Sequence, residues 1–372
     1  MRPENPRPIF FWAGVAVLTL LLAGLARGSA LLPGDTSARR PPTQAPTAAA
    51  APEPAPGPLL ADWRGFISLA GPDTPATIRR ETASDQLASL RGHGFAGSVS
   101  GTGRRVAYWV TTAAGAQDLR VFDVTAPDQD TPLTTLLPGE RGTAAVWSSD
   151  RAGVAVSVEA SSGGGAETQF SALRVVDTPT RSIREIARLS DGDRFVPVGW
   201  DRGAQLVGAC IAAPDGTAVA YDVVGEDAQS ARTPMEPGIA ASSVQSNGSA
   251  VLAIVNGTVV RVWTIGSYGD HRELGARPDE RIAFARWKPG GTGIVVSIAD
   301  RLEVWPSQGG DHRLVASGLP AAADLLVSTD GAIAVLSFDS GRSAVAVDLA
   351  SGRAAAVPMA GERVLAAISF RG

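Results

Sequence analysis

The sequence predicts an all-β fold: a β-propeller of seven four-stranded blades, with six blades as the alternative. Two series of short apolar stretches repeat in phase along the chain and support this prediction. Each stretch of the first series ends at a marker residue that is followed by a polar or turn-forming residue. The markers lie 40 to 53 residues apart: Val99, Trp147, Trp200, Gln245, Trp287, Val327 and Ile368. A period of about 40–50 residues that holds several short strands is typical of propeller blades.

The second series consists of alternating stretches that fit the third strand of each blade. They end at Asp123, Asp177, Asp222, Trp263, Trp305 and Asp348. The unit from Ile282 to Ala316 shows the whole pattern, because four apolar stretches alternate there with Gly-, Pro- and Asp-containing turns. Such a meander of four short antiparallel strands is the content of one blade.

Two local motifs support this repeat. The tetrapeptide Gly-Asp-His-Arg occurs at 269–272 and again at 310–313, one period apart. Asn256-Gly257 is a two-residue hairpin signal, since a type I′ turn needs positive φ at both central residues. We interpret His271 and His312 as structural turn residues rather than a metal pair, because each lies in an equivalent turn and is followed by arginine.

The two ends of the domain are expected to close the ring together. The seventh first-strand copy, 365–369, lies three residues from the end of the sequence, so its partner strands must come from elsewhere. Segments 66–70, 76–80 and 86–90 supply three candidate strands at the other end of the domain. Pairing the two ends in one blade leaves no exposed first-to-last edge, which would otherwise invite aggregation.

The N-terminal region predicts export and a membrane anchor. Residues 9–26 are uncharged and apolar, and as a helix they are long enough to cross a hydrocarbon core of about 30 Å. Arg2 and Arg7 precede this run, so the positive-inside tendency places residues 1–8 in the cytoplasm and the rest of the chain outside. A cleaved signal, which would release a secreted protein, is the alternative.

The remaining chain divides into a linker and one domain. Residues 27–58 are rich in Pro, Ala and Thr, a composition that stays extended and holds the domain away from the membrane. The propeller is expected over 59–372. Hydrophobic residues make up 44% of the chain and charged residues 19%, as in globular proteins. A net charge of −4 gives no basic surface for nucleic acid.

Several conspicuous residues have structural interpretations. The tryptophans at fixed registers of the first and third strands are expected in the core between blades, not on a stacking surface for ligands. Cys210, the only cysteine, lies in an apolar stretch and is expected to be buried. Lys288 is the only lysine, and we interpret the preference for arginine as codon bias in a GC-rich genome.

Some stretches resemble a known family. Segment 145–150 followed by 154–158, and segment 326–331 followed by 333–336, are similar to the repeat of TolB-like and WD-repeat β-propellers. In that repeat an apolar–Trp/Phe–Ser–Pro–Asp–Gly box precedes an apolar strand. Leu90-Arg-Gly-His-Gly94 is similar to the Gly-His dipeptide of WD repeats.

This resemblance extends over about residues 90–372, although its motifs are degenerate. No copy has the complete Ser-Pro-Asp-Gly box, and no third strand ends in Trp-Asp. The resemblance implies the propeller fold and a role in protein interaction. It assigns no ligand-binding residue.

The sequence favours a non-enzyme. It has no Gly-x-Ser-x-Gly elbow, and its three histidines form no metal-spaced cluster. Recurrence of the aspartates Asp123, Asp177, Asp222 and Asp348 at one register indicates a structural role, since a catalytic pair would interrupt the repeat. We expect no catalytic, cofactor-binding or metal-binding residues, and no cofactor.

The expected function is therefore that of a membrane-tethered extracytoplasmic propeller. Its partner would be a protein or a component of the cell envelope, bound on a loop face. A propeller hydrolase or lyase with a divergent site at the central channel is the alternative. A sensory ectodomain is a third hypothesis, which the eight residues before the apolar run disfavour.

Overall fold

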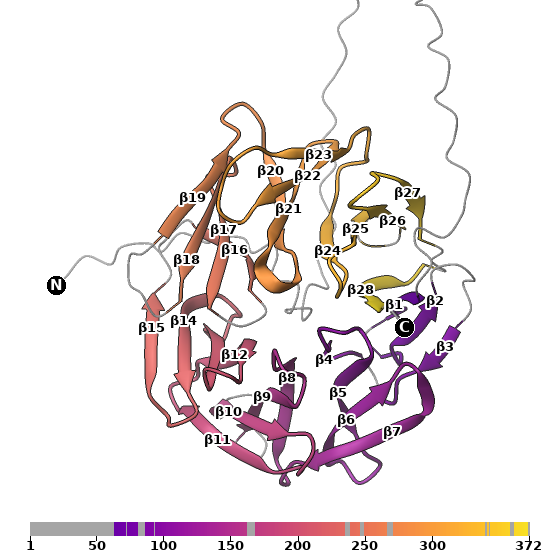
Figure 1. Ribbon diagram of the computed structural model, residues 1–372. Coiled ribbons are helices and arrows are strands. Elements are labelled where there is room, and N and C mark those ends of the chain that lie inside the picture. Colours follow the sequence, from indigo (N-terminus) through magenta and orange to yellow (C-terminus); the bar gives the residue numbers. More distant parts are fainter. Residues whose placement is uncertain are drawn as a thin grey trace, which may run out of the picture.

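A computed structural model describes residues 63–71, 73–80, 86–92, 94–161, 168–234, 239–245, 249–265, 271–338, 341, 343–357 and 361–370. These residues form 28 strands and one 3₁₀ turn, η1 (Pro289–Gly291), with no α-helix among them. The strands form seven four-stranded sheets that stand in a ring (Figure 1). The prediction of a seven-bladed propeller is confirmed, and the six-bladed alternative is wrong.

The blades are numbered along the chain, and their strands are given from the innermost to the outermost. Blade 1 consists of β28 (Arg363–Phe370), β1 (Trp63–Leu69), β2 (Thr77–Arg80) and β3 (Gln86–Ser89). Blade 2 consists of β4 (Gly97–Val99), β5 (Arg105–Thr111), β6 (Gln117–Asp123) and β7 (Ala126–Thr135). Blade 3 consists of β8 (Glu140–Trp147), β9 (Gly153–Ser161), β10 (Thr168–Asp177) and β11 (Ile183–Leu189). Blade 4 consists of β12 (Arg194–Asp201), β13 (Leu206–Ala212), β14 (Ala218–Gly225) and β15 (Ser230–Pro234).

The other three blades have the same order of strands. Blade 5 consists of β16 (Ile239–Val244), β17 (Ala250–Val255), β18 (Val259–Thr264) and β19 (His271–Ala276). Blade 6 consists of β20 (Ile282–Trp287), β21 (Gly293–Ile298), β22 (Arg301–Pro306) and β23 (Arg313–Ala316). Blade 7 consists of β24 (Asp324–Val327), β25 (Ile333–Phe338), β26 (Ser343–Asp348) and β27 (Ala354–Ala356). All neighbouring strands within a blade are antiparallel.

The ring closes in blade 1, where strands from the two ends of the domain pair. β28 runs antiparallel to β1, from Trp63 opposite Phe370 to Leu69 opposite Arg363. In Figure 1 β28 lies beside β1. The three strands that the sequence places at the start of the domain are β1, β2 and β3, and they occupy the positions that the C-terminal strand lacks.

The repeat markers identify the inner strands correctly. Val99, Trp147, Trp287 and Val327 are the last residues of β4, β8, β20 and β24. Trp200 and Ile368 lie near the ends of β12 and β28, and Gln245 directly follows β16. The hairpin prediction is also confirmed, because Asn256 and Gly257 have φ values of 52° and 73°.

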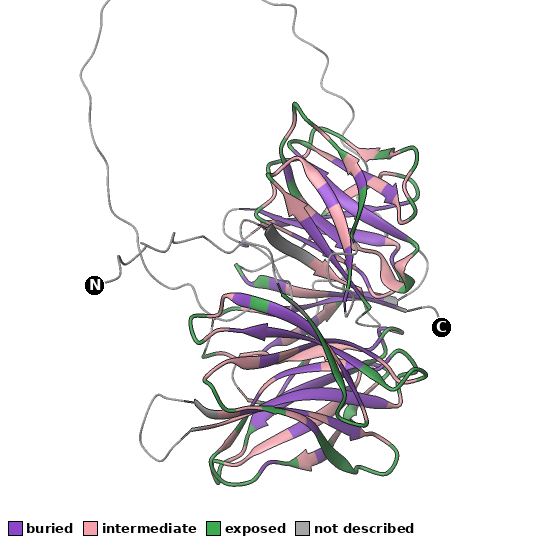
Figure 2. Cartoon of the chain, turned by 90° about the vertical axis from the view of Figure 1, so that its left-hand side faces the viewer, coloured by how far each residue is buried: buried purple, intermediate pink, exposed green. Residues whose placement is uncertain are grey.

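The core lies between neighbouring blades, where sheet faces pack against each other. One apolar cluster joins blades 2 and 3 and includes Trp109 and Trp147. Gly142 makes this packing possible, because a Cβ there would lie 2.1 Å from the Trp109 ring. In Figure 2 the buried residues follow the strands, and the exposed ones lie in the connecting turns and on outer strands such as β11 and β19.

The tryptophans support this arrangement with one exception. Trp147, Trp200, Trp263 and Trp305 are between 0 and 8% exposed, which confirms their place in the core. Trp287 is only half-buried, although it packs against the apolar cluster of blades 5 and 6.

The predicted anchor and linker, 9–26 and 27–58, lie outside the described residues. Among the residues that the structure does describe, no helix has the length and apolar character that a membrane span requires. The signal anchor therefore stays a prediction.

Candidate functional site

Each blade contributes turns to both faces of the ring. Face 1 carries the turns between the first and second strands and between the third and fourth strands. Face 2 carries the turns between the second and third strands and the connections from one blade to the next. Trp63, the first residue of β1, pairs with Phe370, the last residue of β28, at the face 1 end of blade 1. The domain's first strand therefore begins on face 1, and its last strand ends there.

A hydrogen-bonded turn on face 1 reproduces the box that the sequence resemblance rests on. In blade 3 the Ser148 hydroxyl donates to Asp150 over 2.6 Å, and the Gly153 N–H donates back to the Ser148 oxygen over 3.0 Å. The Ala152 N–H donates to Asp150 over 3.1 Å. The serine and aspartate side chains thus stabilise this turn by hydrogen bonds, with Ser149 at the position where the repeat of the resembled family has proline.

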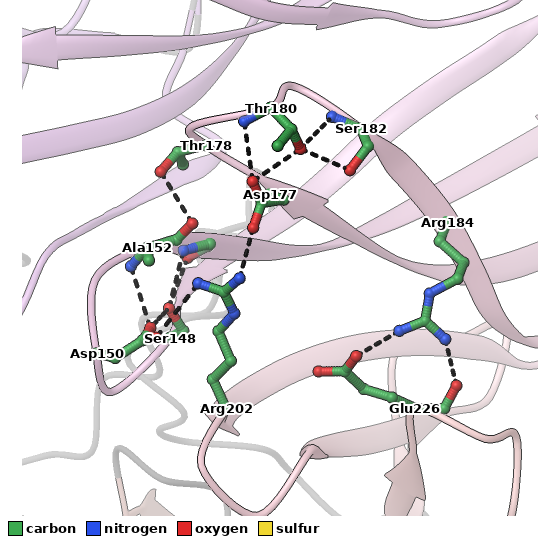
Figure 3. A network of polar contacts seen from close by, with 11 residues as sticks. Ser148, Asp150, Ala152, Asp177, Thr178, Thr180, Ser182, Arg184, Arg202 and Glu226 are labelled. Carbon is green, nitrogen blue, oxygen red and sulfur yellow. Dashed lines mark hydrogen bonds and ion pairs between the residues drawn. The ribbon is translucent and has the colours of Figure 1, made fainter.

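One arginine connects this turn to two other elements of face 1 (Figure 3). Arg202, from the first turn of blade 4, donates to Asp150 over 3.3 Å and also to Asp177 at the end of β10. Its guanidinium carbon lies 6.0 Å from the Trp200 ring centroid. Farther out, Arg184 of β11 donates to the carbonyl and the carboxylate of Glu226 in blade 4. The loops of blades 3 and 4 are thus joined by charged side chains.

The two aspartates of this network stay ionised near neutral pH. Burial opposes ionisation of Asp150, but hydrogen bonds from Ser148 and Ala152 and the charge of Arg202 outweigh it and lower its pKa. The N–H and hydroxyl of Thr180, followed by Arg202, lower the pKa of Asp177. Neither carboxyl is suited to donate a proton to a substrate.

A second charged network lies between blades 5 and 6. Glu303 accepts hydrogen bonds from Trp305 Nε1 over 2.7 Å, from Arg277 over 2.8 Å and from Arg301 over 3.0 Å. Burial opposes its ionisation, but these three donors lower its pKa. Arg301 also bonds to Glu280, and this contact lowers the pKa of Glu280.

The two histidines of the repeated tetrapeptide pack on tryptophans. His312 stacks on Trp305 with ring centroids 3.9 Å apart, and His271 lies 5.5 Å from Trp263. Burial, followed by the charge of Arg277, lowers the pKa of His312. The turn interpretation is therefore wrong for His271, which is the first residue of β19, whereas His312 lies just before β23. The structure gives both histidines a physical reason, which is packing on a third-strand tryptophan.

The recurring aspartates divide into two kinds. Asp123, Asp177 and Asp348 accept hydrogen bonds within their own turns, from Thr125, Thr180 and Ser351. Asp222 differs, because β14 continues to Gly225 and leaves this carboxyl inside the sheet. It is 1% exposed, its nearest cation is Arg232 at 3.6 Å, and burial raises its pKa.

A shallow hollow of about 410 Å³ lies on face 2 beside the second network. It is lined by Asn256, Gly257, Thr258, Pro278, Asp279, Glu280 and Arg281. Cys210 is buried as predicted, and burial raises its pKa to about 12. Across the described part of the chain, no group of three or more His, Cys, Asp or Glu residues is arranged to hold a metal ion.

Comparison with known proteins supports the fold and goes no further. No protein-family model and no curated protein matches this chain. An oligogalacturonate lyase in complex with manganese matches with a TM-score of 0.51 at 14% identity, over 80% of this chain and 83% of its own. A Bacteroides fragilis protein assigned as a 6-phosphogluconolactonase matches with a TM-score of 0.52 at 11% identity, over 85% of this chain and 99% of its own. TolB from Acinetobacter baumannii is a weaker match, with a TM-score of 0.41 at 13% identity, over 81% of this chain and 64% of its own.

The chain is therefore a β-propeller. At identities of 14 and 11%, the likenesses to the lyase and to the Bacteroides fragilis protein show the fold alone and transfer no activity. The fold that the TolB-like resemblance implies is confirmed by the seven blades themselves. The function has to be argued from the residues of the faces.

Proposed function

We propose that this chain is a non-catalytic propeller that binds a protein or another component of the cell envelope through the loops of face 1. Residues 9–26 would hold it in the membrane, with 1–8 in the cytoplasm and the propeller outside. If that segment is cleaved, the same domain is secreted.

The observation that supports binding over catalysis is the state of the carboxylates. Four carboxylates of the two charged networks, Asp150, Asp177, Glu280 and Glu303, are bonded to arginine, and the pKa of each is lowered. A general acid needs a pKa raised toward the working pH. The networks therefore join neighbouring blades and present ordered charged groups, which suits recognition.

A hydrolase or lyase is the alternative from another class. Asp222 is the carboxyl in the described part of the chain whose pKa is raised, as a general acid would require. It lies inside the sheet of blade 4 with 1% of its surface exposed, out of reach of a substrate. This placement favours the binding function.

Photo-crosslinking in intact cells tests the proposal. A photoreactive residue at Ala204 reports on face 1, and one at Leu137, which is 67% exposed, reports on face 2. Mass spectrometry of the adducts should identify a recurring envelope protein or component joined through Ala204. Absence of any adduct from both positions in cells would contradict a binding function.

The single buried cysteine allows the topology to be tested separately. Because Cys210 is 2% exposed, Leu137→Cys would add one accessible thiol to an otherwise unreactive chain. A membrane-impermeant maleimide should label the new thiol from outside when it is added to cells whose outer envelope layers have been removed. Labelling that appears only after lysis would place the propeller in the cytoplasm.

A further inference from the structure

Blades 3 and 7 build their first turn on face 1 with the same hydrogen bonds. The Ser148 hydroxyl donates to Asp150 over 2.6 Å in blade 3, and the Ser328 hydroxyl donates to Asp330 over 2.7 Å in blade 7. In both blades a backbone N–H then returns to the serine oxygen over 3.0 Å. The two turns therefore have the same hydrogen-bonded structure at two places in the ring.

The turns between the third and fourth strands of these blades also match. Asp177 accepts from the N–H and hydroxyl of Thr180 over 2.9 and 2.8 Å. Asp348 accepts from the N–H and hydroxyl of Ser351 over 2.8 and 2.9 Å. Blade 7 therefore serves as an internal reference for what this fold requires on face 1.

The two blades differ at the left-handed position of each turn. Blade 7 has Gly331 with φ 69° and Gly352 with φ 74°. Blade 3 has Arg151 with φ 66° and Arg181 with φ 58° at the equivalent positions. Glycine adopts this conformation without a steric penalty, whereas a side chain with a Cβ does so at a cost. Neither arginine is explained by its turn.

Backbone conformations of this kind are concentrated at one place in the ring. Six non-glycine residues of the described chain have positive φ, and four of them lie on face 1 of blades 3 and 4. These four are Arg151, Arg181, Gln205 and Ala228. Unfavourable backbone conformations that persist in a fold often mark functional sites.

The two arginines are available to a partner. Both are exposed, and within the described part of the chain neither guanidinium has a hydrogen bond or ion pair. Ile183 and Leu206, each 39% exposed, lie at strand ends on the same face. Arginine is enriched in protein interfaces, and exposed aliphatic residues on the same face add apolar surface that a partner can cover.

We propose that face 1 of blades 3 and 4 is a docking surface for an acidic segment of a partner protein. Carboxylates of that segment pair with Arg151 and Arg181, and its apolar residues cover Ile183 and Leu206. Arginine suits this role because its planar guanidinium binds a carboxylate through two parallel hydrogen bonds. This inference rests on the proposed binding function and names its surface and the chemistry of its partner.

The surrounding charges favour a peptide over an extended polyanion. Arg184 and Arg202 are already paired with Glu226, Asp150 and Asp177. A membrane surface or a nucleic acid would therefore meet these carboxylates together with the free arginines. A protein segment can instead place individual carboxylates where the unpaired guanidinium groups are.

The structure itself suggests the test variant. Arg151→Gly with Arg181→Gly restores the residues that blade 7 carries, so the double variant should fold at least as well as the parent. Ala228→Gly is the matched control, because it removes a side chain from the same backbone conformation on the same face without removing charge. Thermal unfolding of the full chain in mild detergent checks that both variants are folded.

In cells, the photoreactive residue at Ala204 is combined with each variant. We expect adducts to an acidic segment of one partner in the parent and in Ala228→Gly. When the concentration of the partner is limiting, the yield of these adducts should fall about tenfold in the double variant. This factor corresponds to the loss of two exposed ion pairs. A fluorescent oligoglutamate peptide, titrated onto the purified chain, should bind the parent and Ala228→Gly more tightly than the double variant. Its binding should weaken as the salt concentration rises.

The outcomes separate this inference from the proposed function. Equal adduct yield in the double variant would overturn the docking surface while leaving binding through face 1 in place. Adducts from Leu137 alone would overturn both the docking surface and face 1 as the binding face. No adducts from either position would remove the binding function itself. Binding to phosphatidylglycerol vesicles that the double variant loses, with no binding of oligoglutamate, would identify a membrane surface as the occupant and also overturn the inference.

Discussion

Neutralising Glu362 should weaken the closure of the ring. Glu362 precedes β28 and accepts hydrogen bonds from Ser68, from Thr77 over 3.2 Å and from Arg79 Nε over 2.9 Å. All three partners belong to β1 and β2, so this carboxylate joins the end of the domain to its start. Its side chain is 10% exposed, which limits screening by solvent.

The size of the effect can be worked out from the pKa. The hydrogen bond from Arg79, opposed by burial and assisted by Ser68 and Thr77, lowers the pKa of Glu362 from 4.5 to about 2. At about 1.4 kcal/mol per unit, ionised Glu362 stabilises the fold by about 3 kcal/mol at neutral pH. Glu362→Gln keeps the size of the side chain but removes this charge and the ion pair with Arg79, so we expect a loss of about 2–3 kcal/mol.

Urea unfolding of the full chain in mild detergent, followed by tryptophan fluorescence, measures this loss. Glu273→Gln is the matched control, because Glu273 is 55% exposed and pairs with Arg261 over 2.8 Å. An exposed pair of this kind should contribute less than about 1 kcal/mol. Hydrogen exchange should also rise in β28 and β1 of Glu362→Gln more than in β13, since the closure lies in blade 1.

The pH dependence of the difference in unfolding free energy between parent and Glu362→Gln can refute this account. A carboxyl with a lowered folded-state pKa contributes stability above its unfolded pKa, near 4.5, and loses it as the pH falls toward about 2. The difference between parent and Glu362→Gln should therefore be full at pH 7 and about half as large near pH 3. A difference that does not shrink, or one no larger than that of Glu273→Gln, would refute this account of the closure.

Two further substitutions and one thiol reaction have defined outcomes. Gly275→Ala would place a Cβ 2.6 Å from His312, so we expect a loss of about 1–3 kcal/mol in urea unfolding, whereas Gly101→Ala, with open space around it, should be neutral. Cys210, 2% exposed and with its pKa raised to about 12, should react with Ellman's reagent only after denaturation, and rapid reaction of the folded chain would contradict its burial. Ala299→Gly should raise the melting temperature, because Ala299 has φ 49° and glycine removes about 1 kcal/mol of backbone strain, and a lower melting temperature would contradict this reason.

The sequence predicted the architecture well because period and alternation are local properties. Each inner strand ends within two residues of its marker, and the last strand pairs with the first segment of the domain as expected. Closure was predictable for a simple reason: one inner strand lacked partners, and three segments lacked an inner strand.

The polar networks could not be predicted in the same way. Glu362 and Ser68 are 294 residues apart, and nothing near either residue signals the other. Arg202 reaches Asp150 and Asp177 only because the ring places the turns of blades 3 and 4 side by side. A repeat pattern locates such residues in equivalent turns, but which charges meet depends on the side chains of neighbouring blades.

The repeat itself is a tool for finding function in a chain of this kind. The seven blades repeat one backbone, so equivalent turns show which residues the fold itself requires. A residue that differs from its equivalent in another blade, and that has a less favourable backbone conformation there, needs an explanation other than folding. Gly331 and Gly352 meet the need of blade 7, and Arg151 and Arg181 take the same φ at a cost. Because the hydrogen bonds of the two turns are the same, the difference lies in the side chains presented to the surroundings. This difference between blades 3 and 7 selects face 1 of blades 3 and 4 for mutagenesis.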